Sequence, residues 1–281
     1  MNILQIDETW NPIIGCLYDC RYCRARIYAD NLQESTEKYK DGFCEPKLVE
    51  NELNRVFRNK LVAVSLMGEM FGEWVPDHWI LGVLKVVVAS PKAMFLFMTK
   101  NPKRYIDLLN KHIAYYPKNV ILGATIESNR DFPVTKAPSV VERYNAMKEL
   151  QFERKQISIE PIMDFDFDVF LQWIKDIKPI LVSIGYDNHY FRLSEPDLHK
   201  TKQFIAELQK FTEVKQLNLR ERVSQFNPEH LYRTMHPPKL SNRPILAVFK
   251  QSRKFRPFLS KKGKKQQKEG EMRKIGKQNQ N

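Results

Sequence analysis

The sequence predicts an α/β protein folded as a TIM-like barrel, complete or partial, of six to seven parallel strand–helix units. Short apolar segments recur along the chain with centres about 30 residues apart, which is the spacing of repeating strand–helix units. These segments are nearly continuous in apolar residues, as in parallel strands that are covered on both faces. The stretches between them are long enough for helices, and two carry apolar residues at helical spacing.

The predicted strands follow in chain order. The first precedes Cys16, and the others lie at 61–69, 93–100, 120–127, 156–162, 180–186 and 214–219. We predict helices at 77–90, with the sequence DHWILGVLKVVVAS, and at 194–211, which opens with Ser-Glu-Pro-Asp. Such a combination of a capping residue and acids is typical of a helix start.

Composition and charge indicate one folded domain followed by a basic tail. The chain has 281 residues, of which 42% are apolar, enough for a sizeable core. Residues 250–281 contain twelve Lys/Arg and two acids, so they hold +10 of the net charge of +13. We assign 1–249 to the barrel and 250–281 to the tail, and expect disorder beyond about residue 258, because few apolar residues are available to offset the entropy of ordering. The tail is expected either to contact nucleic-acid phosphate or to act as a solubilising end.

The sequence also bears on location. No apolar run approaches the length of a membrane span, and the N-terminal MNILQIDETW lacks the layout of a secretory signal. Four cysteines, three of them crowded, do not form a disulfide framework in a chain of this length. We expect a cytoplasmic monomer without a membrane partner.

Polar side chains follow the predicted strands. They are Ser65, Gly68-Glu69, Thr99-Lys100, Thr125, Glu127, Ser158, Glu160 and Asp187-Asn188-His189. One polar strand end is ordinary, but the carboxyl ends of barrel strands share one mouth. We therefore expect these residues to converge on a site.

The stretch TWNPIIGCLYDCRYCRARIYAD (9–30) contains Cys16, Cys20 and Cys23. Structural zinc takes four ligands, usually as two short-spaced pairs, and the fourth would have to be Cys44 or one of six histidines. Thiol–disulfide exchange suits Cys20 and Cys23 alone but leaves Cys16 unexplained. Three closely spaced thiolates suit three corners of a 4Fe-4S cluster and leave one iron open.

The C-x3-C-x2-C spacing with Tyr22 before the last cysteine resembles the radical S-adenosylmethionine superfamily. Further blocks are similar to an uncharacterised phage- and prokaryote-distributed family related to spore photoproduct lyase and similar DNA-repair radical enzymes. Between residues 8 and 220 they are, in order, TWNPIIGC, MGEMFGEWVPDHWI, FMTKNPKRY, ILGATIESN and SIEPIMDF. The resemblance implies a radical S-adenosylmethionine fold of the same barrel type.

The resemblance also implies cofactors and a partner. Cys16, Cys20 and Cys23 would hold the 4Fe-4S cluster, and its open iron would bind the amino and carboxylate groups of S-adenosylmethionine. Reduction by an external one-electron donor of the flavodoxin or ferredoxin type would then cleave the cofactor to a 5′-deoxyadenosyl radical.

Individual positions carry over as cofactor contacts. Met67-Gly68-Glu69 stands where the superfamily has Gly-Gly-Glu, which contacts the cofactor's amino group. The remaining implied contacts are Tyr22 against the cluster, Thr125 and Glu127 at the carboxylate or ribose, and Ser158 and Glu160 near the adenine and ribose.

Some residues keep two interpretations. Spore photoproduct lyase uses an additional cysteine as a hydrogen-atom donor, so Cys44 is either such a donor or an inert loop cysteine. Trp74 and Trp79 either stack a base or pack at a helix start. The substrate is not identified, although the tail and the resemblance favour nucleic acid. The alternative function is a nucleic-acid-binding protein whose iron–sulfur or zinc site is purely structural.

Overall fold

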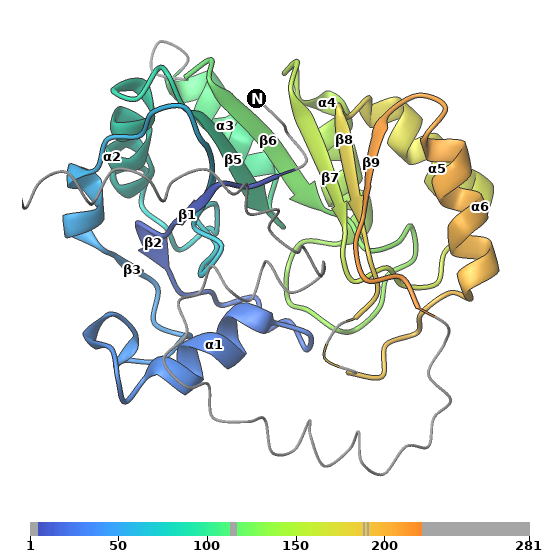
Figure 1. Ribbon diagram of the computed structural model, residues 1–281, viewed down its shortest axis with the longest axis horizontal. Coiled ribbons are helices and arrows are strands. Elements are labelled where there is room, and N and C mark those ends of the chain that lie inside the picture. Colours follow the sequence, from blue (N-terminus) through green and yellow to red (C-terminus); the bar gives the residue numbers. More distant parts are fainter. Residues whose placement is uncertain (1–4, 113–116, 188, 190, 221–281) are drawn as a thin grey trace, which may run out of the picture.

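The computed structural model describes residues 5–112, 117–187, 189 and 191–220. Seven strands form one parallel sheet, which curls into a partial barrel with helices on its outer side (Figure 1). In sheet order they are β1 (Glu8–Trp10), β4 (Leu61–Val64), β5 (Met94–Thr99), β6 (Val120–Thr125), β7 (Lys155–Ile159), β8 (Leu181–Ile184) and β9 (Glu213–Gln216). Within the described residues β1 and β9 form the two edges. The predicted partial barrel of parallel strand–helix units is confirmed.

Helices connect the strands from β4 onward. They are α2 (Asp77–Val88), α3 (Lys103–His112), α4 (Val140–Glu149), α5 (Phe167–Ile177) and α6 (Leu198–Leu208). The helices predicted at 77–90 and 194–211 correspond to α2 and α6. The second begins later than Ser194, because Asp197 is its N-cap and accepts a 2.7 Å hydrogen bond from Lys200 N.

The connection between β1 and β4 is more elaborate than a single helix. It contains α1 (Arg24–Leu32), the short antiparallel pair β2 (Ile13–Ile14) and β3 (Lys47–Leu48), and the 3-10 helices η1 (Glu37–Tyr39) and η2 (Glu50–Asn54). In Figure 1, α1 lies below the sheet, at the end toward which β5 and β6 point. The start of this connection contacts the chain just after β4, where Gly15 forms an isolated bridge with Gly68.

The two faces of the sheet pack into different clusters. Val62, Val64, Phe95 and Phe97 lie in the main core, which includes residues of the outer helices. Leu61, Leu96 and Ile121 form a separate buried cluster, as expected for alternate side chains on the opposite face. Each fully buried Val, Leu or Phe stabilises the fold by roughly 1.5–3 kcal/mol relative to exposure. The apolar runs in the sequence therefore correspond to strands buried on both faces.

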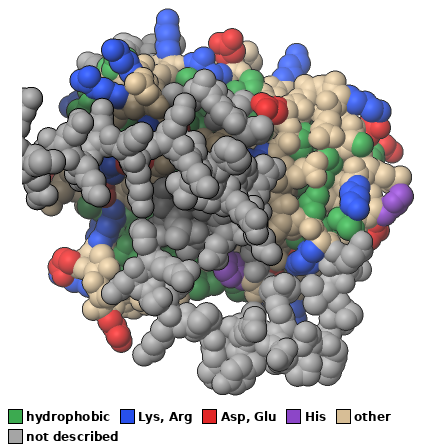
Figure 2. Space-filling view, in the orientation of Figure 1, with side chains coloured by type: hydrophobic (Ala, Val, Ile, Leu, Met, Phe, Trp, Pro, Cys, Tyr) green, Lys and Arg blue, Asp and Glu red, His purple; other side chains and the backbone are tan. Residues whose placement is uncertain are grey.

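The face of the molecule seen in Figure 2 carries charges of both signs on its described residues. On the face seen in Figure 2, the described Lys and Arg side chains are interspersed with acidic ones rather than gathered in one patch. None of the described helices is long and apolar enough to cross a membrane. The predicted tail, 250–281, lies outside the described residues, and so does Asn188.

Candidate functional site

The loop that carries Cys16, Cys20 and Cys23, called the cysteine loop below, is anchored where the backbones of Gly15 and Gly68 meet. Gly15 and Gly68 form an isolated parallel bridge, in which Gly15 N donates to Met67 O and Glu69 N donates to Gly15 O, both at 3.0 Å. A Cβ atom on Gly68 would lie 2.8 Å from the backbone of Ile14. At Gly15 the φ angle is +84°, which favours glycine. Gly68 therefore allows the cysteine loop to pack against the end of β4.

The three loop cysteines all belong to, or pack against, one small apolar cluster. Tyr18, Cys20 and Tyr22 form its buried part, and Cys16 and Cys23 pack against it. Burial raises the pKa of the Cys16 thiol, and the nearby carboxylate of Glu69 raises it further. Burial also raises the pKa of Cys23. The loop therefore places three thiols in a partly dehydrated environment beside a carboxylate.

Glu69 is buried beside this loop and is held by three donors. Its Oε1 accepts hydrogen bonds from Thr99 Oγ1 at 2.6 Å and Phe71 N at 3.1 Å, and its Oε2 accepts one from Lys100 N at 2.9 Å. Burial raises the pKa of this carboxyl, while the three donors act in the opposite direction. A carboxylate has about four acceptor positions. Oε2 accepts one bond from the described residues and so keeps capacity for another donor.

Glu127 is the centre of a buried ion cluster. Its Oε1 accepts a hydrogen bond from the Tyr22 hydroxyl, and its Oε2 accepts one from Arg143 Nη1 at 2.7 Å. Lys100 Nζ lies 3.4 Å from Oε1 and 5.3 Å from the centre of the Tyr22 ring. Burial alone raises the pKa of Glu127, but the charges of Arg143 and Lys100 lower it below its ordinary value. Glu127 is therefore an ionised carboxylate already occupied by protein donors.

Lys100 interacts with the predicted acids at the ends of the strands. Burial lowers the pKa of its ammonium group, yet Glu127 and Glu69 are among the groups that raise it above its ordinary value. Burial raises the pKa of Glu160, and Lys100 is one of the cations acting against that shift. Hydrogen bonds and an ion pair thus bring together the polar residues that follow β4, β5 and β6, as the sequence predicts.

The other predicted residues at this end are less central. The Ser158 hydroxyl donates to Glu160 Oε1 at 3.4 Å. Thr125 is half-buried, and its carbonyl accepts a 3.0 Å hydrogen bond from Arg143. The Asp187 carboxylate accepts the backbone N–H of His189 at 2.8 Å, so it is used within its own loop.

Cys44 is exposed although its neighbour contacts the cysteine loop. Cys16 N donates to Phe43 O at 3.0 Å, which places the segment around Cys44 beside that loop. Met67, at the position of the superfamily's first glycine, is buried in a cluster with Ile14 and Phe43. Its side chain therefore belongs to the cluster against which Cys16 and Cys23 pack.

Arg143 is a site residue that the sequence reasoning missed. It is almost fully buried on α4, on the same helix as the buried Val140, Ala146 and Met147. The sequence does carry a signal for it: Arg143 lies at helical spacing from the apolar residues Val140, Ala146 and Met147. An arginine on a helix is usually solvent-exposed, so the signal is easily overlooked.

Tyr18 and Trp74 contribute two unpartnered polar atoms near the same loop. Their rings pack edge to face with centres 4.8 Å apart. Tyr18 Oη and Trp74 Nε1 are buried and have no hydrogen-bond partner among the described residues. Burial raises the pKa of Tyr18, and the carboxylates of Glu69 and Glu73 raise it further. Both Trp74 and Trp79 also pack against the main core.

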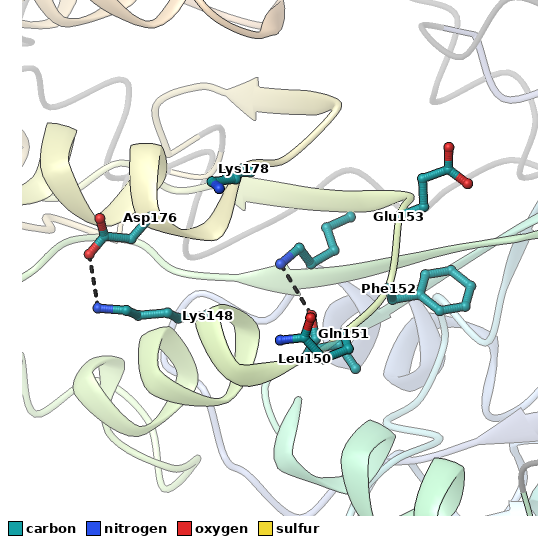
Figure 3. A pocket seen from close by; sticks show the side chains of 8 residues that line it. Lys148, Leu150, Gln151, Phe152, Glu153, Asp176 and Lys178 are labelled. Carbon is teal, nitrogen blue, oxygen red and sulfur yellow. Dashed lines mark hydrogen bonds and ion pairs between the residues drawn. The ribbon is translucent and has the colours of Figure 1, made fainter.

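A cavity of about 520 Å³ lies away from this site, at the start of β7 (Figure 3). Two of its lysines, Lys155 and Lys148, have structural partners. Lys155 Nζ donates to Met147 O at 3.1 Å and to Leu150 O at 3.2 Å, at the end of α4. Lys148 pairs with Asp176 at 3.2 Å. Cations are favourable at helix C-termini. Barrel enzymes use the opposite end of the strands, so we do not assign this cavity to the site.

Comparison with solved structures gives several similar folds. A spore photoproduct lyase variant with bound AdoMet and dinucleoside spore photoproduct is 12% identical with a TM-score of 0.46, and the match covers 78% of this chain and 66% of that chain. Another variant of that enzyme is 12% identical with a TM-score of 0.49, covering 78% and 81%. Streptococcus suis SuiB bound to precursor peptide SuiA is 12% identical with a TM-score of 0.46, covering 76% and 49%. This chain thus spans just under two thirds of the first of these structures and about half of SuiB.

Comparison with curated proteins gives no match. A family match extends over residues 1–179, which is more than half of the 281-residue chain. The chain belongs to the family described as "Protein of unknown function (DUF5131)".

Proposed function

We propose that this protein is a radical S-adenosylmethionine enzyme that holds a 4Fe-4S cluster on Cys16, Cys20 and Cys23. The observation that carries the proposal is the position of the cysteine loop, which is bridged through Gly15 to the strand end that carries the buried Glu69. Three thiols, a buried carboxylate with spare acceptor capacity and nearby cations are the groups that a cluster and an amino-acid-like cofactor require.

The donor set fits a cluster better than a single metal ion. Among the described residues, no three His, Cys, Asp or Glu side chains are grouped so as to hold one ion. In a structural zinc site four ligands coordinate one ion, whereas each cysteine of a cluster binds a different iron atom. The zinc alternative therefore has less support in the described part of the chain.

The unpartnered atoms also fit a bound polar molecule. A buried donor without a partner costs roughly 1–3 kcal/mol, so Tyr18 Oη and Trp74 Nε1 are expected to be satisfied by a ligand. The charge of Glu69, the residue that we assign to the cofactor's ammonium group, is one of the causes that raise the pKa of Tyr18. These two donors would therefore contact a polar group of the bound molecule other than its ammonium group.

When bound and reduced by one electron, the cluster would supply the electron that cleaves S-adenosylmethionine to methionine and a 5′-deoxyadenosyl radical. Glu69 Oε2 would accept a hydrogen bond from the ammonium group, and the arriving positive charge would offset the burial of the carboxylate. The cofactor's carboxylate would be repelled by Glu127, so we assign it to the cations that Glu127 holds, Arg143 and Lys100. Glu127 would orient these cations and the Tyr22 ring.

We assign the adenine and ribose of the cofactor to residues at the ends of β6 and β7. Ser158 and Glu160 would contact the adenine and ribose from β7, and Thr125 would do so from β6. We propose an external reductant of the flavodoxin or ferredoxin type, and nucleic acid as the substrate class that the basic tail favours. Cys44 is a candidate hydrogen-atom donor because it is exposed beside the cysteine loop.

Anaerobic reconstitution with iron and sulfide tests the metal site. The wild-type chain should bind about four irons, and Cys16→Ala, Cys20→Ala and Cys23→Ala should each lose them. Cys44→Ala is the matched control and should keep the iron content of the wild type.

Two outcomes would overturn the proposal. Loss of iron in Cys44→Ala would indicate a four-cysteine site without an open iron. A single tightly bound zinc per chain that excludes iron would favour the alternative of a nucleic-acid-binding protein with a structural metal.

A further inference from the structure

The sulfur of Cys20 differs from the other two loop sulfurs in its hydrogen-bond partner. Cys16 Sγ and Cys23 Sγ each accept a backbone N–H at 3.4 Å. Cys20 Sγ lies 3.1 Å from the hydroxyl of Thr135. A backbone N–H is present whatever the side chain, whereas a hydroxyl depends on the residue at position 135.

Two backbone hydrogen bonds fix this side-chain pair. Arg21 N donates to Val134 O at 2.8 Å, and Lys136 N donates to Tyr18 O at 2.7 Å. Both join the cysteine loop to the segment between β6 and α4, which is more than 100 residues away in the chain. The hydroxyl is therefore held beside the sulfur by its own backbone and not by chance contact of side chains.

The available hydrogens determine the direction of the bond. Thr135 Oγ1 accepts a 3.1 Å hydrogen bond from Ala137 N, and its own hydrogen can go to Tyr18 O at 3.3 Å or to Cys20 Sγ. A thiol can donate to the hydroxyl, but an iron-bound thiolate can only accept. Once Cys20 binds iron, a hydrogen bond between these two atoms requires the Thr135 hydroxyl as the donor, and Cys20 Sγ, at 3.1 Å, is nearer to it than Tyr18 O, at 3.3 Å.

We propose that Thr135 is a positioning residue that donates to the Cys20 thiolate and raises the reduction potential of the cluster. The inference rests on the proposed function. Hydrogen bonds to the cysteine sulfurs are among the factors that set cluster potentials, because they offset the extra negative charge of the reduced state. Cys20 is the buried member of the three, and a low dielectric strengthens the effect.

Thr135→Val and Thr135→Ser separate the hydroxyl from the shape of the side chain. Each full-length variant is reconstituted anaerobically and titrated with dithionite at controlled potential, with the reduced cluster followed by electron paramagnetic resonance. Thr135→Val should shift the one-electron equilibrium about tenfold toward the oxidised form, which is about 59 mV. Thr135→Ser should keep the wild-type potential.

Ser139→Ala is the matched control. Ser139 caps α4 at the end of the same segment, and its hydroxyl accepts from Glu142 N at 3.3 Å. The variant removes a hydroxyl that caps the helix. Among the described residues this hydroxyl makes no hydrogen bond to a cysteine sulfur, so the reduction potential of the cluster should not change.

Each outcome decides between the proposals. A wild-type chain that binds no iron contradicts the proposed function. A loaded Thr135→Val with the wild-type potential, or a Thr135→Ser that behaves like Thr135→Val, overturns the role of Thr135. If Thr135→Val and Thr135→Ala lose the iron while Thr135→Ser retains it, the hydroxyl serves assembly and its role in the potential is also overturned.

Discussion

Arg143 Nη1 donates a 2.7 Å hydrogen bond to Glu127 Oε2, and neither side chain is more than 2% exposed. The bond joins α4 to the end of β6 inside the mouth of the barrel. Lys100, 3.4 Å from the same carboxylate, extends the cluster to β5. Charged groups rarely occur at such burial unless they are paired. The cluster is therefore both a structural element and the positive side of the proposed cofactor site.

Arg143→Met should destabilise the apoprotein at pH 7. Removing one partner of a buried ion pair costs about 3–5 kcal/mol, and we expect about 3 kcal/mol because Lys100 still faces Glu127. Chemical denaturation measures the loss. Arg130→Met is the control, since Arg130 pairs with Asp164 and Asp166 at the surface and should change stability little.

The same pair predicts a pH dependence. The folded state lowers the pKa of Glu127 below its ordinary 4.5, so its contribution to stability is complete above that pH and is lost as the pH falls through the folded pKa. The stability difference between the wild type and Arg143→Met should therefore shrink on acidification below about pH 4.5. A difference that is constant from pH 7 to pH 3 would contradict the ion-pair explanation.

Glu69→Gln should weaken S-adenosylmethionine binding without changing the iron content. A charge-assisted hydrogen bond contributes roughly 1.5–3 kcal/mol, which corresponds to about a ten- to hundredfold loss of affinity. Cofactor titration of the reconstituted variant measures it. Glu73→Gln is the control, because Glu73 is exposed on the following loop. If Glu69→Gln binds the cofactor with wild-type affinity, this carboxylate only accepts hydrogen bonds from Thr99 and its neighbours and has no role in cofactor binding.

Deletion of residues 259–281 should leave iron content and folding unchanged, because the composition of this segment is too polar to form a core. If the tail contacts phosphate, the truncated chain should bind nucleic acid more weakly and with a flatter salt dependence. Electrophoretic or fluorescence titrations at several salt concentrations measure both. Identical slopes with and without the segment would assign it to solubility.

The strands could be predicted from sequence because each is a nearly continuous apolar run. Leu61–Val64 and Leu181–Ile184 are buried throughout, so nothing in their pattern competes with the strand interpretation. The pair Ile13–Ile14 and Lys47–Leu48 was not predicted, because two-residue strands have no periodicity of their own. They pair with each other across the segment that contains the three cysteines and α1, a contact that only the folded chain shows.

The site was predictable where side chains follow strands and less so elsewhere. Glu69, Glu127 and Glu160 were identified because parallel strands end on one side. Arg143 and Thr135 come from a helix and a long loop, and only tertiary packing brings them to Glu127 and Cys20. The role of Gly68 also needed the structure, since the missing Cβ makes room for the backbone of Ile14.

The most direct measurement is the effect of S-adenosylmethionine on the electron paramagnetic resonance spectrum of the reduced, reconstituted full-length protein. An open iron beside Glu69 predicts that adding the cofactor changes the spectrum and that 5′-deoxyadenosine forms in the presence of a one-electron reductant. Cys44→Ala should give the same spectral change. A four-iron cluster whose spectrum is unaffected by the cofactor, with no 5′-deoxyadenosine, would contradict the proposed function.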